Sequence, residues 1–316
     1  TAVLSAALGL PPAVIEGIFA PQDAVVLGIP GNGFGGLIEF ATTGNVGALN
    51  FPYATDADES WDEFLPSASI NWNYSDSGMA YFSASRGYKS GAFVSSTNTV
   101  AAAQTPLEPE IATNYELGLK SQWLDNRLRV NASAFYMEYD DLQVFRLIGS
   151  LLVGANAEAT SQGVELDVTA LLSDNWTLTA NYAYLDAEYD EYDDGTDDFS
   201  GNVLPRAPED SFFLRSSYLW TFNNSATVDW IISYAYTGDM NWVPSNALAA
   251  EEDGYGLLDS SLTWMSPESA WEVSLWGKNL TDEEYRSHTI LSNISGTVDL
   301  WAAPRTWGMT VNYVWD

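Results

Sequence analysis

Carboxylates are the main side chains of this sequence that could do chemistry, because the other residues of catalytic and metal sites are scarce. The chain has no cysteine, so thiolate catalysis and cysteine-based zinc sites are excluded. A single histidine, His288, disfavours histidine-dependent triads and histidine-rich metal sites. Glu165 and Asp167 alternate on one side of a predicted strand, but a glycosidase needs two carboxylates held across a sugar. We therefore expect no enzyme and no catalytic residues.

The densest group of carboxylates lies in residues 186–198 (DAEYDEYDDGTDD), where eight of thirteen residues are acidic. Ca²⁺ favours such clustered oxygen ligands, although the spacing is not that of an EF-hand, because Tyr192 stands where a ligand is needed. The residues considered as Ca²⁺ ligands are Asp190, Asp193, Asp194, Asp197 and Asp198. The alternative interpretation is a solvated loop without a specific ion. No other cofactor is expected.

Three aromatic residues, Trp242, Tyr255 and Trp301, lie in or near long links between predicted strands. Aromatic side chains exposed in such links can stack on a sugar, an aryl group or a corrin-like ring. We consider these three as substrate-binding residues. The alternative is that each packs its own loop together.

Composition narrows the class of protein. With 43 acidic against 11 basic residues among 316, the formal net charge is −32, which repels phosphate backbones and excludes nucleic-acid binding. The chain is also 46% hydrophobic and 14% aromatic, which argues against disorder. No stretch reaches the roughly 18 to 20 uninterrupted apolar residues of a membrane-spanning helix.

The elements that must position these residues are β-strands, because apolar and polar residues alternate from about Ser67 onward. In residues 126–136 (NRLRVNASAFY), for example, Leu128 and Val130 lie on one face while Arg127 and Arg129 lie on the other. Eleven strands are predicted, at residues 67–74, 79–90, 111–124, 126–142, 160–172, 175–188, 209–222, 225–239, 255–266, 269–281 and 304–315.

The links between the predicted strands alternate between short and long. Short polar turns such as Ser173-Asp174-Asn175 alternate with long links at residues 91–110, 143–159, 189–208, 240–254 and 282–303. Tight turns at one end and long loops at the other are the plan of an outer-membrane β-barrel. Tryptophans gather next to the short turns, as an interfacial girdle would: Trp72, Trp123, Trp176, Trp220, Trp264, Trp271 and Trp315. The alternative is edge packing in a large soluble β-sandwich.

A series of motifs resembles the barrel of TonB-dependent outer-membrane receptors. They are residues 64–93, which contain SRGYKSGAF, residues 107–120 with NYELGLK, residues 278–285 (KNLTDEEY) and residues 304–308 (PRTWG). The resemblance covers about residues 60–316, in family order. It implies an all-β fold, a transmembrane antiparallel β-barrel, with about eleven strands present of 22. Residues 65–316 would form these C-terminal barrel strands, with short periplasmic turns and long extracellular loops.

The resemblance also implies partners. The N-terminal half of the barrel and its plug are not recognisable here, and the TonB complex would act through that plug. Lumen-facing Lys120, Arg127, Arg129 and Arg215 would pair with acidic plug residues or line a wet path. Outer-membrane lipid and lipopolysaccharide would surround the barrel. Residues 1–64 are expected to form a long, partly apolar extracellular region, of which residues 1–50 fold into the barrel mouth or against a partner chain.

The function implied is active uptake of a bulky, scarce nutrient in the bacterial outer membrane. A ferric siderophore, cobalamin, haem or an oligosaccharide would be such a nutrient. One alternative is a passive porin-like or adhesive outer-membrane barrel without coupling to TonB. A second alternative is a secreted, soluble β-rich protein that binds or hydrolyses carbohydrate.

Overall fold

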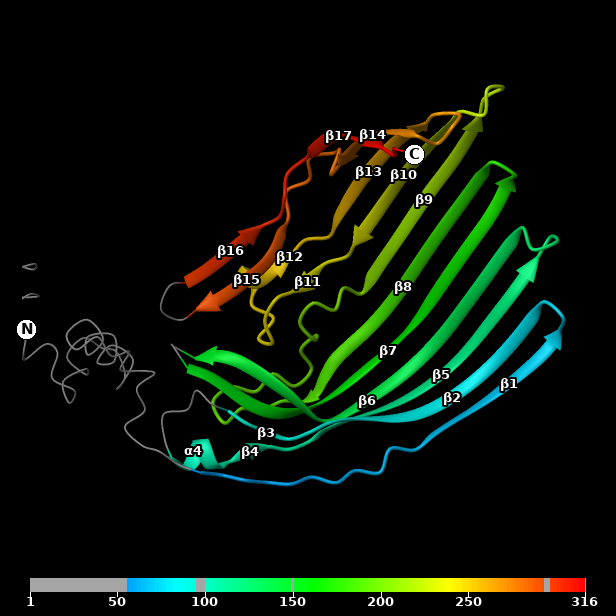
Figure 1. The fold of residues 1–316 in the computed structure, drawn as a ribbon. Helices are drawn as coiled ribbons and strands as arrows, with labels where there is room; N and C mark the ends of the chain where they lie inside the picture. The colour runs from blue at the N-terminus through cyan, green and yellow to red at the C-terminus, as the bar shows by residue number, and fades with distance from the viewer. Residues whose placement is uncertain (1–55, 95–99, 149–150, 293–295, 316) are drawn as a thin grey trace, which may run out of the picture.

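The computed structural model describes residues 56–94, 100–148, 151–292 and 296–315, and these residues are mostly β-strands. Eleven strands form one antiparallel sheet in the order β1-β2-β5-β6-β7-β8-β9-β10-β13-β14-β17. Their bounds are β1 Ser67–Ser75, β2 Gly78–Lys89, β5 Glu110–Trp123, β6 Leu128–Ile148, β7 Leu151–Ser173, β8 Trp176–Glu191, β9 Asp210–Thr221, β10 Thr227–Thr237, β13 Tyr255–Met265, β14 Trp271–Lys278 and β17 Thr306–Tyr313. The sheet curves into a trough that is open along one side (Figure 1).

This order confirms the predicted fold class and the predicted strands. Each strand of the sheet pairs with its neighbour along the chain, so the topology is up-and-down. The two outermost strands, β1 and β17, each pair with one neighbour only among the described residues, with β2 and β14 respectively. Both edges of the sheet therefore present backbone donors and acceptors that the described strands do not satisfy.

Short turns close one end of the sheet, and their sequences suit the sharp reversal. Between β5 and β6, Leu124, Asp125 and Asn126 have φ of 57°, 56° and 66°. This left-handed region is uncommon for residues other than glycine, and it is best tolerated by Asn and Asp. Ser225 and Ser269 occupy the same region in two other short turns. The polar turn residues of the sequence thus reverse the chain at the predicted places.

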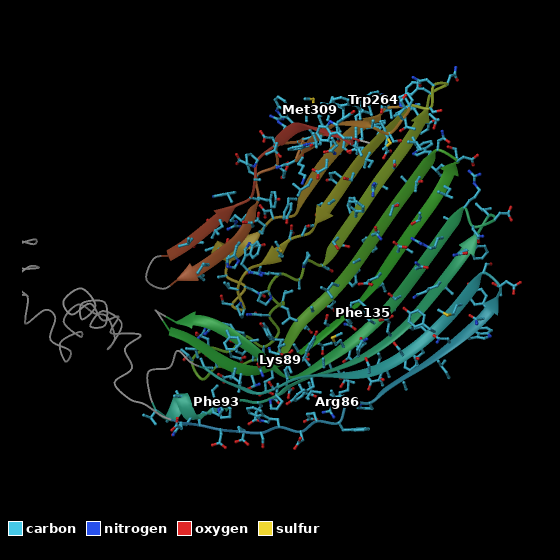
Figure 2. The ribbon with its side chains drawn as sticks, in the orientation of Figure 1. Arg86, Lys89, Phe93, Phe135, Trp264 and Met309 are labelled. Atoms are coloured by element: carbon cyan, nitrogen blue, oxygen red, sulfur yellow. The ribbon has the colours of Figure 1, made fainter. Side chains whose placement is uncertain are left out.

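The two faces of the sheet differ in chemistry, as the alternation predicted. One row of paired apolar residues crosses four neighbouring strands without interruption: Trp230, Leu262, Leu275 and Met309. Each of these side chains is exposed, as are the tryptophans beside the short turns. Met309 and Trp264 lie on the outer side of the trough, whereas Phe135 lies on the side facing its hollow (Figure 2). The outer face is therefore an apolar band.

The inner face carries the polar residues that alternate along each strand with the apolar residues of the outer face. In one row Lys120 of β5 pairs with Asn131 of β6, which pairs with Asp167 of β7, which pairs with Asn181 of β8. A soluble sandwich would bury its apolar face between two sheets. Here the apolar face is the exposed one and the polar face lines the hollow, which is the arrangement of a membrane barrel with a wet interior.

One predicted link is wrong. Residues 143–159 were expected to form a long loop, but β6 continues to Ile148 and β7 begins at Leu151. A bulge between Tyr139 and Leu142, with Asp141 at φ 56°, shifts the register before pairing resumes. The paired Gln143 and Asn156 then donate hydrogen bonds to the link after β2, which supports the extended hairpin.

The remaining long links contain short elements of their own. Residues 90–109 hold β3 (Ala92–Phe93), α4 (Val100–Gln104) and β4 (Pro106–Leu107). Residues 238–254 hold β11 (Met240–Asn241), the 3-10 helix η2 (Leu248–Ala250) and β12 (Glu251–Glu252). Residues 279–305 hold the hairpin of β15 (Arg286–Ser292) and β16 (Gly296–Trp301). The loop end of the sheet is therefore built as small hairpins.

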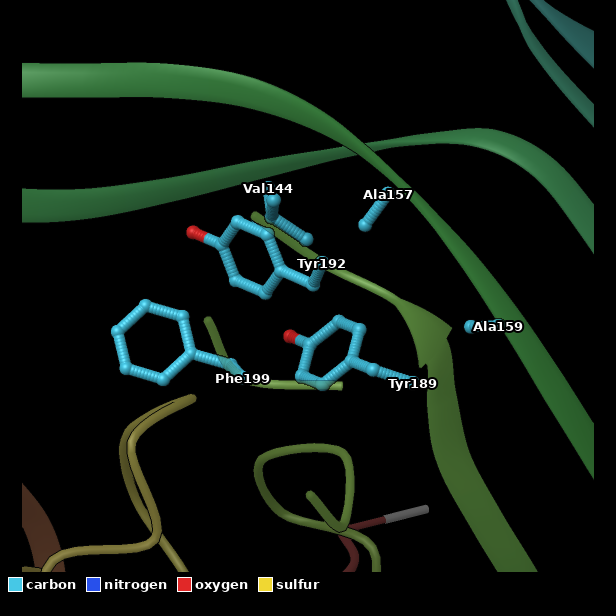
Figure 3. Packing of buried hydrophobic residues seen from close by; sticks show 6 residues of the cluster. All are labelled: Val144, Ala157, Ala159, Tyr189, Tyr192 and Phe199. Carbon is cyan, nitrogen blue, oxygen red and sulfur yellow. The ribbon is translucent and has the colours of Figure 1, made fainter. Parts of the chain in front are cut away.

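The buried core lies among these loops and not between sheet layers. Its cluster comprises Val144, Ala157, Ala159, Tyr189, Tyr192 and Phe199 (Figure 3). The cluster joins the extended β6–β7 hairpin to the link that follows β8. No described helix is long and apolar enough to cross a membrane. The expectations for residues 1–50, and most of the predicted 1–64 region, lie outside the described residues.

Candidate functional site

The loop end of the sheet is the first candidate site, because its links bond one another across several strands. Gln143 Nε2 donates to the carbonyl oxygens of Ser90 (2.9 Å) and Glu108 (3.0 Å). Asn156 Nδ2 donates to the carbonyl oxygens of Glu108 (3.1 Å) and Asp141 (2.8 Å). The link after β2 is thereby fixed to the β6–β7 hairpin, so this rim of the trough is an ordered surface.

The acidic run 186–198 folds back onto the same hairpin around Arg146. The Arg146 guanidinium pairs with Asp194 and with Asp197, the latter at 3.0 Å between Nη2 and Oδ2. It also lies 4.8 Å from the centre of the Phe199 ring. The Asp194 side chain is 1% exposed, and Arg146 is the cation paired with its buried charge. The run is thus an anchored loop.

Hydrogen bonds within the chain occupy some of the other carboxylate oxygens of the acidic run. Asp193 Oδ1 accepts from the Gly195 amide at 2.8 Å, and Asp194 Oδ1 accepts from the Thr196 and Asp197 amides at 2.9 Å each. Asp190 Oδ2 accepts from the Thr160 hydroxyl at 2.6 Å. These aspartates mostly close turns in the backbone.

The five aspartates considered for Ca²⁺ are not arranged around a common point. Across the described parts of the chain, no group of three or more His, Cys, Asp or Glu side chains is placed to hold a metal ion. Ca²⁺ needs six to eight oxygen ligands, so binding would require the loop to rearrange. The Ca²⁺ site stays a prediction.

Tyr192 and Asp198 of this loop have shifted pKa values. Burial, together with the nearby Asp194 charge, raises the pKa of Tyr192 to about 12. Hydrogen bonds from the Ser200 hydroxyl and amide lower the pKa of Asp198 below its usual value. The phenol of Tyr192 therefore stays neutral, and Asp198 stays ionised, over the whole physiological range.

The predicted ligand-binding residue Trp242 follows β11 and contacts two other links. Its ring lies 5.3 Å from the Arg206 guanidinium carbon and meets the ring of His288 edge-on at 5.4 Å. Arg206 Nη2 also donates to His288 Nδ1 at 2.9 Å. The links after β8, β10 and β14 thus meet at these three side chains.

The other two predicted aromatics have different surroundings. Tyr255, at the start of β13, stacks on Tyr285 with ring centres 4.3 Å apart. Trp301, at the end of β16, is exposed and pairs through its backbone with Arg286. No ring contact joins Trp242, Tyr255 and Trp301 to one another within the described residues. Their role in substrate binding stays a prediction.

Side-chain bonds hold the links around Trp242 together. Asn246 Oδ1 accepts from the Val203 amide at 2.8 Å, and its Nδ2 donates to the Val203 carbonyl at 3.0 Å. Arg286 pairs with Glu252 and with Asp299. Because Glu252 is buried, removal of Arg286 would leave an uncompensated charge. The three links therefore form one connected surface.

The second candidate site is a hollow of about 380 Å³ on the inner face of the sheet, lined among others by Tyr81, Lys120, Glu165, Asp167 and Asn181. Asp167 accepts from Asn131 at 3.2 Å and from Asn181 at 2.6 Å. The Lys120 ammonium lies 5.4 Å from the centre of the Tyr81 ring. These polar groups make a wet, wide surface without the convergent acid and base of an enzyme site.

The four predicted lumen cations have separate roles. Arg129 lies 3.9 Å from Asp167, and Arg127 lies 3.5 Å from Asp174 at a short turn. Lys120 and Arg215 have no carboxylate partner among the described residues. Their pairing with acidic plug residues stays a prediction.

Reasoning from the sequence did not identify Arg146 or Arg206 as site residues. Arg146 lies in the extended part of β6 and Arg206 in the link after β8, and contacts with distant residues decide the role of a side chain in both places. The sequence could have pointed to them only through their positive charge, because the chain has 11 basic residues and 43 acidic ones. In such a chain each arginine is a candidate organiser of acidic loops.

The sequence is similar to known outer-membrane receptors. A family described as "TonB dependent receptor-like, beta-barrel" matches residues 39–280. The "Probable TonB-dependent siderophore receptor PiuA" of Acinetobacter baumannii is 28% identical over 160 residues, which cover 47% of this chain and 21% of that protein. The "Ferric-pyoverdine BN7/BN8 receptor" of Pseudomonas putida is 24% identical over 239 residues, which cover 74% of this chain and 27% of that protein. The chain spans about a quarter of the length of these relatives.

Solved structures share the fold. The ferric yersiniabactin uptake receptor FyuA of Yersinia pestis aligns with a TM-score of 0.67 at 23% identity, covering 79% of this chain and 37% of that one. The ferric preacinetobactin receptor BauA of Acinetobacter baumannii aligns with a TM-score of 0.60 at 18% identity, covering 79% and 36%. At these identities the likeness concerns the arrangement of strands.

Proposed function

The chain belongs to the TonB-dependent receptors, as part of their β-barrel, and on that premise we propose that the protein carrying it takes up a ferric siderophore. Two relatives are named as receptors of this kind, one for siderophores and one for ferric pyoverdine. Cobalamin, haem and oligosaccharides, which the sequence left open, have no such support among these relatives.

Membership of the family supports an outer-membrane location and a transport activity for the whole protein. TonB-dependent receptors are proteins of the outer membrane of Gram-negative bacteria, and they are transporters and not enzymes. The apolar outer face of the sheet is therefore the lipid-facing band, and the inner face is the lumen. The short turns then lie at the periplasmic end, and the connected links around Trp242 and Arg146 lie outside the cell.

The observation that supports the proposal is the combination of two features: the inner face of the sheet is polar, and the links at its loop end bond one another into one surface. A lumen lined by residues such as Lys120, Asn131 and Asp167 can hold a polar plug and water, which a dry core could not. The rim places aromatic and cationic side chains from three links side by side. Such a surface suits a large ligand with aryl and charged groups.

The proposal includes further parts of the receptor. The edges at β1 and β17 face lipid, which cannot satisfy backbone groups, so we propose that further barrel strands pair with both edges. The lumen cations without carboxylate partners, Lys120 and Arg215, would face the plug. The TonB complex would act on that plug. Residues 1–50 would cover the barrel mouth or meet a partner chain.

A growth experiment tests the proposed substrate class. The gene that encodes this chain is deleted in its host, and growth is measured under iron chelation with a panel of ferric siderophores supplied singly. We expect the deletion to abolish growth on at least one member of the panel, while free iron in excess restores both strains equally. Equal growth of both strains on every siderophore would contradict the proposal.

A further inference from the structure

Arg206 lies in an unusual position for a cation in so acidic a protein. It follows Pro205 in the link after β8 and has a φ of 60°, in the left-handed region that few residues other than glycine adopt. Its amide donates to the Asn241 carbonyl at 2.8 Å, which fixes this backbone to β11. Strained residues that the surroundings hold in place are concentrated at functional sites.

The guanidinium of Arg206 has no carboxylate partner among the described residues, which include all eleven basic residues of the chain. The other three arginines of the outer links do have one. Arg146 pairs with Asp194 and Asp197, Arg286 with Glu252 and Asp299, and Arg305 with Asp282. Arg206 bonds only a neutral ring and lies over an indole. Its charge is therefore open to an external anion.

The neighbours of Arg206 offer donors as well. A guanidinium can only donate, so Nδ1 of His288 must accept, and the neutral ring then carries its proton on Nε2. No described residue accepts a hydrogen bond from that nitrogen. Trp242 Nε1 is buried and likewise has no acceptor in the described part of the chain. Arg206 and His288 thus offer unused donor capacity beside the apolar ring of Trp242.

We propose that Arg206, Trp242 and His288 form an anion site for a carboxylate or catecholate group on the ferric siderophore. The guanidinium supplies charge and hydrogen bonds to the anionic oxygens. The indole holds the guanidinium plane in place and offers its remaining surface to an aryl ring. This inference rests on the proposed function and adds the chemical class of the ligand, an anionic ferric complex.

Two ferric complexes of different charge test the site. Outer-membrane vesicles with the full receptor that contains this chain are incubated with ⁵⁵Fe-labelled tris(2,3-dihydroxybenzoate), which is anionic, and with ⁵⁵Fe-labelled ferrichrome, which is neutral. We expect the native receptor to bind the anionic complex more tightly. Arg206→Gln should weaken that binding by at least about tenfold and change ferrichrome binding by less than about twofold.

Control variants distinguish loss of the anion site from a general loss of folding or binding. Arg305→Gln removes an outer arginine that already has a carboxylate partner and should leave the preference unchanged. Arg206→Lys keeps the charge without the planar stack and should fall between the native receptor and Arg206→Gln. Heat-modifiable migration in gels shows that each variant has folded.

The outcomes bear on different claims. The anion site is overturned if Arg206→Gln leaves the preference intact, if the native receptor prefers the neutral complex, or if it binds neither while the growth panel succeeds. Failure of the growth panel itself would instead overturn the proposed function.

Discussion

Arg146 Nη2 lies 3.0 Å from Asp197 Oδ2, and this pair joins the extended end of β6 to the link after β8, 51 positions away in the sequence. The same guanidinium compensates the buried Asp194 and covers the ring of Phe199. One arginine thereby holds an acidic loop, which would otherwise repel itself, against the β6–β7 hairpin.

Substitution of Arg146 should release this loop. Arg146→Ala leaves the buried Asp194 carboxylate without a cationic partner, which typically costs about 3–5 kcal/mol. We expect amide hydrogen exchange over residues 190–200 to accelerate by on the order of a hundredfold, since each 1.4 kcal/mol is a factor of ten. Arg305→Ala is the control, because its pair with Asp282 is half exposed and should contribute at most about 1 kcal/mol. Equal effects of both substitutions would contradict the anchoring role.

High pH should loosen the same loop through Tyr192. Its pKa rises from 10.0 to about 12 on folding because the phenol is buried. Between pH 10 and 12 the unfolded loop loses this proton while the folded loop keeps it, so stability present below pH 10 declines across that window. Proteolysis of the loop should therefore quicken from pH 10 to 12, and less so in Tyr192→Phe. An identical pH profile for the variant would exclude this cause.

A charge on the outer face should disturb membrane insertion, whereas a charge on the inner face should not. Leu275 is 52% exposed and lies in the apolar row with Leu262 and Met309. Leu275→Arg should cost roughly 2–4 kcal/mol near the bilayer midplane, and Ser274→Arg, one residue away on the lumen face, roughly none. Denaturant midpoints of the receptor in lipid bilayers measure the difference. The reverse ranking would mean that the two faces are misassigned.

A calcium titration tests the site predicted from the acidic run. Asp190, Asp193, Asp197 and Asp198 each keep one carboxylate oxygen without a partner in the described residues. We expect Ca²⁺ at about 10⁻⁴–10⁻³ M, as in extracellular modules, to slow hydrogen exchange across the loop. Asp193→Asn combined with Asp198→Asn should remove the effect. If Ca²⁺ does not slow hydrogen exchange in the native receptor, the calcium site is wrong and Arg146 alone anchors the loop.

The sheet could be predicted because its strands and turns are determined by residues close together in the sequence. Strict alternation in segments such as residues 126–136, and turn residues such as Asp125-Asn126, determine strands and reversals without knowledge of distant contacts. The β6–β7 extension was not predictable in this way. It depends on Gln143 and Asn156 reaching carbonyl groups of another link, a contact that alternation does not encode.

The same limit applies to the candidate sites. Trp242 could be selected by its type and by its place in a long link. Its partners could not, because Arg206 and His288 lie 36 and 46 positions away on separate links. The acidic run suggested a cation by composition alone, whereas Arg146 supplies one from within the chain.

Energised iron uptake distinguishes a TonB-dependent siderophore transporter from a passive pore. Iron-starved cells with the receptor receive the ⁵⁵Fe siderophore that supports growth in the panel, with TonB intact, with TonB deleted, or with a protonophore. We expect accumulation only when TonB and the proton-motive force are both present, and none without the receptor. Receptor-dependent accumulation that persists without TonB would contradict this expectation and would indicate a passive pore.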